Sequence, residues 1–299
     1  MTTAQTRLST PRKQSGRRID RAYLFMAIPA AALFTAFMVV PAVVAMFFSF
    51  TDYAGYGSWK FVGLRNYLGI FDDPAVLRGY RFTFGFAIVT VLLVNVIALA
   101  LALGLNARIR FRTLLRTVFF VPLVLSAIVI AYVFNFLLSK TAPALFTTLG
   151  WNVTTSVLAD PNWAWLAVVG VTAWQTIPGA MIIYIAGLQA VPEDLYEAAR
   201  LDGAGRWRTF RSVTLPLISG YLLINTILGF KGYLSSYDII VALTNGGPGE
   251  ATQSVAMRIF TGMNAGDYAY QMSNAVIFFV ITVVISLLQL RLPRRGMSI

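Results

Sequence analysis

The stretch Glu197-Ala-Ala-Arg-Leu-Asp-Gly-Ala204, with Leu215-Pro216 shortly after it, lies in a basic loop between two long apolar runs. Apolar runs of this length are typical of helices that cross a lipid bilayer. A helix–glycine–helix segment between two such helices can present a surface to a partner outside the bilayer. The stretch therefore predicts a membrane protein with a docking surface for a soluble protein.

The loop around this stretch, at about 191–216, is predicted to be a short helical hairpin. Acidic residues follow Pro192 directly and suit the positive N-terminal end of a helix. Two alanines in the stretch favour a helix and leave room for another surface to approach closely. Gly203 predicts the end of this first helix, and a second helix is expected from about Arg206.

The composition is that of a protein adapted to lipid. Of 299 residues, 58% are apolar and 12% are charged, whereas soluble domains carry about 25% charged residues. The chain has no cysteine and no histidine. Thiol and imidazole catalysis, Cys/His metal sites and disulfides are therefore excluded.

Six apolar runs are long enough to span a bilayer, which needs about 20 residues per helix. The predicted fold class is all-α, a polytopic membrane protein with six transmembrane helices. A basic tail at 1–21 precedes the six-span domain at 22–292, and a second tail follows at 293–299. The runs lie at 22–51, between Arg81 and Arg108, between Arg116 and Lys140, at 161–192, at 212–230 and between Asp267 and Arg291.

The charge distribution predicts the orientation of these helices. Placing the N-terminus in the cytoplasm puts most of the 24 Lys and Arg residues on that side, as the positive-inside rule expects. Both termini are then cytoplasmic. The net charge of +12 is explained by topology and anionic lipid, so it does not indicate nucleic acid binding.

The fourth run carries a helix breaker. Ile177-Pro178-Gly179 should kink the helix, because proline removes a backbone hydrogen bond. The kink either serves helix packing or opens Gln175, Thr176 and Gly179 onto a translocation pathway.

Other polar residues of the spans have simpler interpretations. Lys231 and Asp238 are two turns apart on one expected helix face and mark the outer interface. Single amides are interpreted as interhelical hydrogen-bonding groups. These are Asn95, Asn135, Asn225 and Gln289.

The opening stretch resembles a family motif. Glu197-Ala-Ala-x-x-Asp-Gly-Ala204, with Phe210 and Leu215-Pro216 following, is similar to the coupling motif of permease subunits in binding-protein-dependent ABC importers. Leu188-Gln-Ala-Val-Pro-Glu-Asp-Leu-Tyr196 and Leu243-Thr-Asn-Gly-Gly-Pro248 resemble the carbohydrate-uptake branch, which includes maltose-type and glycerol-phosphate-type permeases. The resemblance covers about 22–292 and implies the type I ABC importer permease fold.

The resemblance also implies partners and a coupling site. In that family the hairpin inserts into a cleft of a cytoplasmic ATPase, present in two copies, beside a second permease subunit and an extracellular or periplasmic solute-binding protein. The cargo would be a sugar, the location the bacterial cytoplasmic membrane, and ATP and magnesium would be bound by the ATPase, with no cofactor in this chain. The coupling residues would be Glu197, Ala198, Ala199, Asp202, Gly203 and Ala204.

Two further expectations concern the cargo and the motor. By resemblance, the substrate pathway would include Gln175, Thr176, Gly179, Gly229, Gly232, Tyr233 and Ser236. Several of these are glycines, which departs from the family and predicts either a wider cavity or a partner subunit that holds more of the ligand. None of the four lysines lies in a G-x-x-x-x-G-K-[ST] phosphate loop, so this chain is not expected to hydrolyse ATP.

The alternative function is a secondary transporter driven by an ion gradient. Such proteins place carboxylates near the bilayer midplane, and Asp238 is the one weak candidate in this sequence. A membrane enzyme is a third alternative, but no acid, base or metal-ligand cluster in the sequence supports it.

Overall fold

The computed structural model describes residues 21–107, 110–150 and 155–291. It divides into two units, Met1–Phe47 and Phe48–Ile299. Apart from one isolated bridge between Thr51 and Phe61, the regular structure of the described residues is helical. The predicted tail at 293–299 and all but the last residue of the tail at 1–21 lie outside the described residues.

The first unit is helical from residue 21 onward. It comprises α1 (Arg21–Phe34), the π-helical turn η1 (Thr35–Val39) and most of α2 (Val40–Phe48). Its stretch Phe25–Phe48 is long and apolar enough to cross a membrane. A helix that is apolar on every side is stable in lipid, and the stretch lies within the predicted first span at 22–51.

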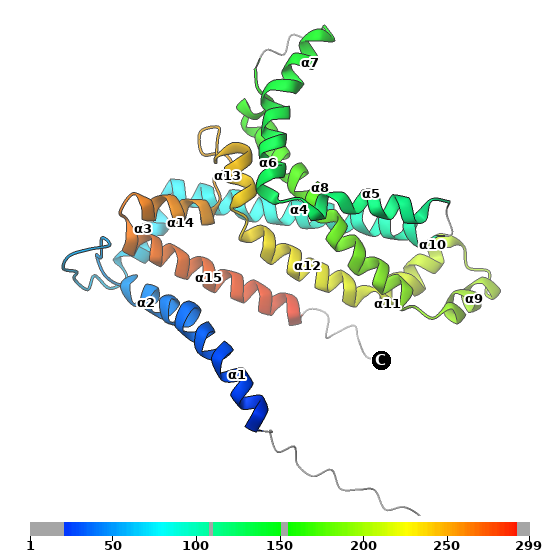
Figure 1. Ribbon diagram of the computed structural model, residues 1–299, viewed down its shortest axis with the longest axis horizontal. Helices are drawn as coiled ribbons and strands as arrows, with labels where there is room; N and C mark the ends of the chain where they lie inside the picture. Colours follow the sequence, from blue (N-terminus) through cyan, green and yellow to red (C-terminus); the bar gives the residue numbers. More distant parts are fainter. Residues whose placement is uncertain (1–20, 108–109, 151–154, 292–299) are drawn as a thin grey trace, which may run out of the picture. The chain divides into compact units, whose positions relative to one another are not determined.

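The second unit is a bundle of helices that Figure 1 shows in order of colour. Its elements are α3 (Arg65–Asp72), α4 (Pro74–Asn106), α5 (Arg112–Val124), α6 (Ala127–Phe136), η2 (Leu137–Thr141), α7 (Ala142–Thr148), η3 (Val157–Ala159), α8 (Pro161–Gln189), α9 (Glu193–Leu201), α10 (Arg206–Thr209), η4 (Phe210–Thr214), α11 (Leu215–Leu217), α12 (Ser219–Leu234), α13 (Asp238–Thr244), α14 (Val255–Asn264) and α15 (Tyr268–Arg291).

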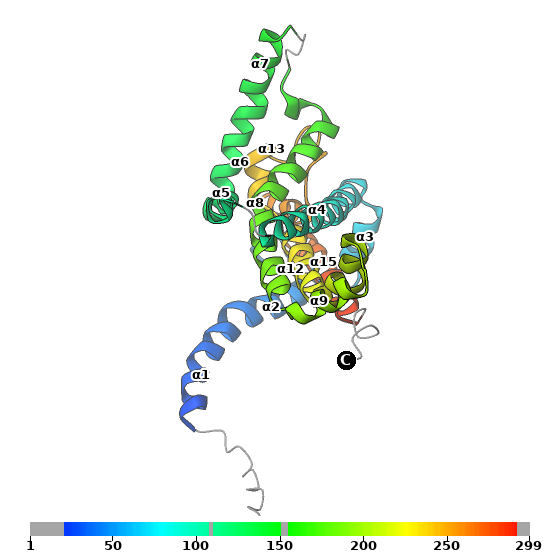
Figure 2. The same cartoon turned by 90° about the vertical axis from the view of Figure 1, so that its right-hand side faces the viewer.

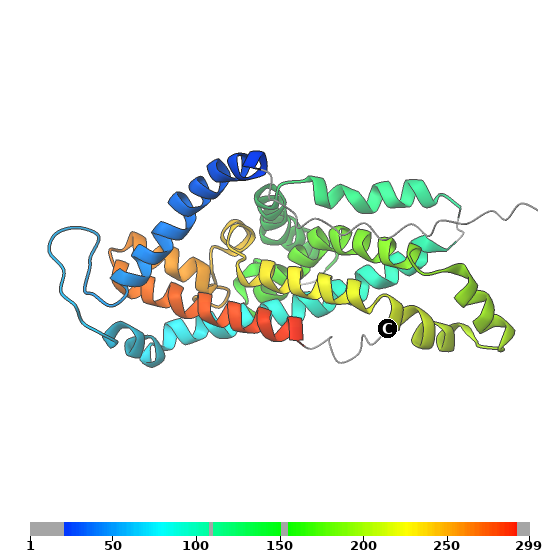
Figure 3. The ribbon, with the colours of Figure 1, turned by 90° about the horizontal axis from the view of Figure 1, so that it is seen from below.

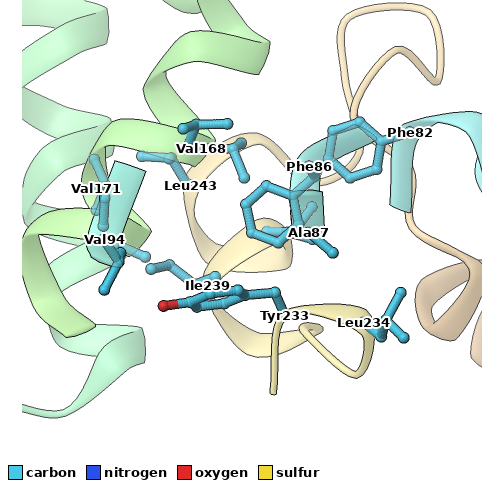
Figure 4. Close-up of a cluster of buried hydrophobic side chains, with 14 of the residues drawn as sticks. Phe82, Phe86, Ala87, Val94, Val168, Val171, Tyr233, Leu234, Ile239 and Leu243 are labelled. Atoms are coloured by element: carbon cyan, nitrogen blue, oxygen red, sulfur yellow. The ribbon is translucent and has the colours of Figure 1, made fainter. Parts of the chain in front are cut away.

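The core of this unit is formed by α4, α8, α12 and α13. Phe86 on α4, Val168 on α8 and Leu234 on α12 are buried there with Ile240 and Leu243 of α13. Figure 4 shows these helices contributing apolar side chains to one cluster around the Tyr233 ring. A second cluster, with Tyr184 and Ile218 at its centre, joins α8 to the segment before α12.

Membrane spans are recognised by helix length and composition. Among the described residues, five helical stretches are long and apolar enough to cross a membrane, and the bent pair Arg206–Leu217 and Ser219–Leu234 would make a sixth. The expected all-helical polytopic fold is confirmed. Three of the predicted spans, the second, the third and the fifth, differ from the sequence-based expectation.

The third predicted span is broken in the middle. α5 ends at Val124, and Leu125 has extended backbone dihedrals before α6 starts at Ala127. The carbonyl of Leu125 accepts a hydrogen bond from Gln175 Nε2 at 3.4 Å, which replaces a helical partner. The apolar helix then continues past Lys140 to Thr148, and α6 and α7 extend away from the α4, α12 and α15 layer (Figure 2).

The fifth predicted span does not begin at Ser212. The helical pair bends by 64° at Ile218, so that the apolar helix α12 starts at Ser219. Pro216 cannot donate a backbone hydrogen bond one turn back, and the π-turn η4 lies directly before it. Prolines and π-turns are common causes of sharp helix bends.

Three smaller expectations are corrected or refined. The second span starts at Pro74 rather than after Arg81, because Asp73 caps the helix by accepting hydrogen bonds from Ala75 N and Val76 N. Lys231 and Asp238 lie on different helices, α12 and α13, and not on one face. α8 runs as one helix through Pro178.

The two ends of the second unit carry different structures. Figures 1 and 3 show α3 and α14 at one end and α9 and α10 at the other. At the α14 end, Glu250 has a positive φ of 66° and accepts hydrogen bonds from Arg78 and Arg258, each at 3.0 Å. These two ion pairs attach the loop after α13 to α4 and α14.

The ion pairs around Glu250 predict a pH-dependent stability. The Arg78 guanidinium, with Arg258, holds the pKa of the Glu250 carboxyl below its ordinary value of 4.5, against an opposing effect of burial. A carboxyl with a lowered pKa stabilises the fold above that ordinary value, and the stabilisation is lost as pH falls through the folded-state pKa.

We expect Glu250→Gln to lower the free energy of unfolding at pH 7 by no more than about 1 kcal/mol per ion pair, because the pairs are partly exposed. The difference from the unsubstituted protein should shrink at a pH well below 4.5, where the carboxyl becomes protonated in the folded state as well. Thermal unfolding in detergent at both pH values measures it, with Asp72→Asn on the exposed end of α3 as the control. A deficit that is as large at low pH as at pH 7 would contradict the ion-pair explanation.

Candidate functional site

The predicted hairpin is present as two short helical arms. α9 (Glu193–Leu201) forms the first arm, with Pro192 at its N-cap and Glu193 and Asp194 in its first turn. α10 and η4 (Arg206–Thr214) form the second arm. The acidic residues lie at the positive end of the α9 dipole, which stabilises the helix.

The turn between the arms depends on Gly203. The N–H of Gly203 donates to Arg200 O at 3.0 Å, and the N–H of Ala204 donates to Ala199 O at 2.9 Å. This pair of hydrogen bonds is the Schellman ending of a helix, which requires a left-handed residue after the cap. Gly203 has a φ of 70°, which a residue with a side chain adopts at a cost.

The residues of the predicted coupling motif are mostly on the surface. Glu197, Ala198, Asp202 and Gly203 are exposed, Ala204 is half-buried and Ala199 is buried.

Two large apolar side chains of the hairpin lie on the surface. Leu201 is 90% exposed and Trp207 is 71% exposed. Large exposed apolar groups beside polar ones mark interaction surfaces. Their place in a short polar hairpin, within four residues of the helix-ending Gly203, could have identified them as surface groups.

The base of the hairpin is tightly packed. Tyr196 Oη and Thr214 Oγ1 are 3.2 Å apart and join the two arms. Gly187, near the end of α8, lies against the Tyr221 ring of α12: a Cβ atom at Gly187 would be 2.7 Å from Tyr221 Cγ. The helices that lead into and out of the hairpin are thus in close contact.

A cavity of about 240 Å³ lies between α4, α8 and α12. Five of the predicted pathway residues line it. These are Thr176, Gly179, Gly229, Gly232 and Tyr233. A Cβ at Gly229 would lie 3.3 Å from both the Tyr233 ring and Val91, so the absence of a side chain there keeps the cavity open.

Hydrogen bonds between helices surround the cavity. Thr176 Oγ1 and Tyr233 Oη, 2.9 Å apart, join α8 to α12. Asn225 Nδ2 donates to Ala180 O at 3.1 Å, and Tyr184 Oη donates to Asn95 Oδ1. Because buried polar groups need partners in lipid, these bonds hold the helices in register.

Two lining residues were not predicted as pathway residues. Asn95 and Asn225 were interpreted as interhelical hydrogen-bonding groups, and Asn225 does bond across to α8. Asn135 also bonds across, to Leu243 O at 2.6 Å. Polarity alone does not separate the two roles; the rotation of each helix decides which amides face the cavity.

The other two predicted pathway residues lie elsewhere. Gln175 reaches the break between α5 and α6, as described above. The carbonyl of Ser236 accepts a hydrogen bond from Ser254 Oγ at 3.2 Å in the loop between α12 and α13. Neither residue lines the cavity.

The chemistry of the cavity is that of binding rather than catalysis. Its polar groups are hydroxyls and amides, and its lining residues carry no charge. Across the described part of the chain, no cluster of three or more acidic side chains could hold a metal ion. Hydroxyls and amides suit a ligand that both donates and accepts hydrogen bonds.

Comparison with known proteins agrees with this geometry. Residues 95–295 match a family described as the binding-protein-dependent transport system inner membrane component. The chain is 31% identical over 276 residues to the probable starch degradation products transport system permease protein of Thermoanaerobacterium thermosulfurigenes, covering 91% of this chain and 94% of the relative. It is also 31% identical over 276 residues to the multiple sugar-binding transport system permease protein of Streptococcus mutans serotype c, covering 91% and 95%.

The fold has a solved counterpart. A chain of the bacterial alginate ABC transporter, solved in complex with an alginate pentasaccharide-bound periplasmic protein, matches with a TM-score of 0.79 at 20% identity. The match covers 93% of this chain and 96% of that chain. It shows that the present fold is that of an ABC importer permease.

The contact between Gly187 and Tyr221 yields a test of the hairpin base. Gly187→Ala places a methyl group against the ring, and we expect destabilisation of about 1–3 kcal/mol from overpacking. Tyr221→Ala in the same chain should relieve the clash and recover part of the loss. The control is Gly170→Ala on the same helix, because the added carbon would have no atom within 4 Å. Thermal unfolding measures all four proteins; a Gly187→Ala variant as stable as the control would refute the close contact.

Proposed function

The chain belongs to the family of binding-protein-dependent transport system inner membrane components and is a multi-pass ABC importer permease; from this we propose that it carries a sugar through the cavity between α4, α8 and α12. The observation that carries the proposal is the composition of that cavity. Its polar groups are the side chains of Asn95, Thr176, Asn225 and Tyr233. Sugars present hydroxyls that donate and accept, and an aromatic ring offers a flat apolar face to a sugar ring.

The relatives support a sugar as cargo. Two of them are named for starch degradation products and for multiple sugars. The uncharged lining described above favours a neutral sugar over a phosphorylated one, because a charged ligand without a counter-charge is costly at membrane depth.

The proposed complex contains three kinds of partner. A second, similar permease would complete the pathway, and two copies of a cytoplasmic ATPase would bind the hairpins of the two permeases. A solute-binding protein would deliver the sugar at the opposite end, a role for which the solved alginate transporter complex is the precedent. The hairpin and both termini would then face the cytoplasm of a bacterial cell.

The proposed mechanism is alternating access driven by the ATPase. ATP and magnesium would be bound by the ATPase, and no cofactor would bind this chain. α8 leads into the hairpin and α12 leads out of it, and both line the cavity. Movement of the hairpin by closing ATPases would therefore move two walls of the cavity together. The hairpin residues in contact with the ATPase would be those of the Glu197–Ala204 motif, including Asp202.

Transport in proteoliposomes tests the function. Uptake of a labelled sugar should require ATP, a cytoplasmic ABC ATPase, the second permease and the binding protein. Dissipating proton and sodium gradients should leave the rate unchanged. Uptake by this chain alone on an ion gradient would instead establish a secondary transporter and overturn the proposal.

Gly203→Asp tests the coupling role of the hairpin. The substitution places a charge on the exposed turn and a side chain at a positive φ, so we expect at least a fivefold loss of sugar-stimulated ATP hydrolysis with normal membrane insertion. Gly57→Asp is the matched control, since Gly57 also has a positive φ, of 77°, and open space around it but lies far from the hairpin in sequence. Equal activity of the two variants would count against docking at Gly203.

Tyr233→Phe tests the cavity. The variant keeps the ring but loses the hydroxyl that pairs with Thr176. Loss of one hydrogen bond is worth about 0.5–1.5 kcal/mol, so we expect the sugar concentration for half-maximal uptake to rise about two- to tenfold while the complex assembles normally. Tyr237→Phe, outside the cavity lining, should change nothing. An unchanged concentration dependence would remove Tyr233 from the sugar site.

A further inference from the structure

The two arms of the hairpin carry opposite charges. α9 carries Glu193, Asp194 and Glu197 against one basic residue, Arg200, so its net charge is negative. The second arm carries Arg206, Arg208 and Arg211, and the sequence between Gly203 and Ile218 contains no acidic residue. A partner surface of one charge sign does not explain this segregation, because such a surface attracts one arm and repels the other.

The arginines of the second arm are free to bind an anion. Arg206, Arg208 and Arg211 are all exposed, and the ion pairs found among the described residues both involve Glu250 at the other end of the unit. Beside them, the exposed Trp207 stacks on Phe210 with ring centroids 5.6 Å apart. Arginines next to an exposed tryptophan are typical of segments at the membrane–water interface.

The position of the second arm places it beside the bilayer. It is joined to the apolar helix α12 through α11, with the 64° bend at Ile218. A polar helix bent away from a span at this point lies near the headgroups, not across them. The three arginines are thus within reach of the leaflet into which α12 inserts.

We propose that the second arm, α10 and η4, binds anionic phospholipid headgroups, while the acidic α9 is repelled from the same leaflet. The lipid would orient the hairpin so that α9 faces the aqueous side, where a soluble partner can reach it. Each arginine at an anionic surface favours binding by about fivefold. This inference goes beyond the proposed cargo and rests on the assignment of α12 as the part of the bent helix pair that enters the bilayer.

The experiment uses the assembled complex in nanodiscs of phosphatidylcholine with phosphatidylglycerol, at about 30 mol%, as the anionic lipid. Either the anionic or the zwitterionic lipid is brominated, at equal bromine content, and tryptophan quenching is measured. The part of the quenching that disappears in Trp207→Phe belongs to Trp207. We expect brominated phosphatidylglycerol to quench Trp207 at least threefold more than brominated phosphatidylcholine.

Substitution of the arginines should abolish this preference. In the triple variant Arg206→Gln, Arg208→Gln, Arg211→Gln, the ratio of the two quenching values should fall to about one. The control variant Lys60→Gln, Arg65→Gln, Lys140→Gln removes the same charge from exposed residues outside the hairpin and should keep the preference. High salt should reduce the preference in the unsubstituted complex, because it screens exposed charges; this measurement does not depend on the folding of any variant.

Two outcomes would overturn the proposal. Equal quenching by both lipids in the unsubstituted complex would mean that Trp207 is an apolar anchor without headgroup selectivity. Quenching that appears only when the ATPase is removed would mean that the second arm is part of the ATPase-binding surface and does not bind lipid in the working complex.

Discussion

The close contact of α8 with α12 at Gly187 is the constraint on which the rest of the structure depends. The Tyr221 ring occupies the space that any side chain at position 187 would need. The hairpin connects these two helices, and the same two helices form walls of the cavity. Packed interiors have few voids and switch between arrangements instead of deforming gradually. A displacement of the hairpin is therefore passed to the cavity and is not absorbed at the helix crossing.

The cavity combines helix packing and ligand binding in the same groups. The pair Thr176–Tyr233 joins α8 to α12, and Tyr184–Asn95 joins α8 to α4. In lipid an unpaired polar group costs several kcal/mol, so these groups must remain paired when the helices move. When such a pair separates, a hydroxyl of a hydroxyl-rich ligand can form a hydrogen bond with each group in place of its former partner. The cavity can therefore open around such a ligand without leaving buried groups unsatisfied.

Much of the fold follows from sequence because its signals are local. Long apolar runs specify spans, and Gly203 ends α9 because it alone in the turn adopts the left-handed conformation at low cost. The break at Leu125 was not predictable, since the hydrogen bond that stabilises it comes from Gln175, 50 residues away. The bend at Ile218 follows a π-turn that has no sequence signature of its own. The start of α4 was missed although Asp73-Pro74 is a typical helix start, because the predicted span was limited to the apolar run after Arg81.

The candidate site shows the same division between local and tertiary information. The positions of Thr176 and Gly179 on one cavity wall follow from their spacing on α8, whereas Gln175, one residue earlier, points to a different neighbour. Adjacent residues on a helix are about 100° apart around its axis, so family motifs place a segment near a ligand but do not choose among its faces.

Arginine is used differently at the two ends of the bundle. Arg78 and Arg258 form ion pairs with Glu250 that fix a loop. The exposed arginines of the second hairpin arm instead follow the acidic helix α9 in the sequence. Separating the charges along the hairpin, instead of pairing them, leaves each arm able to respond to a different surface.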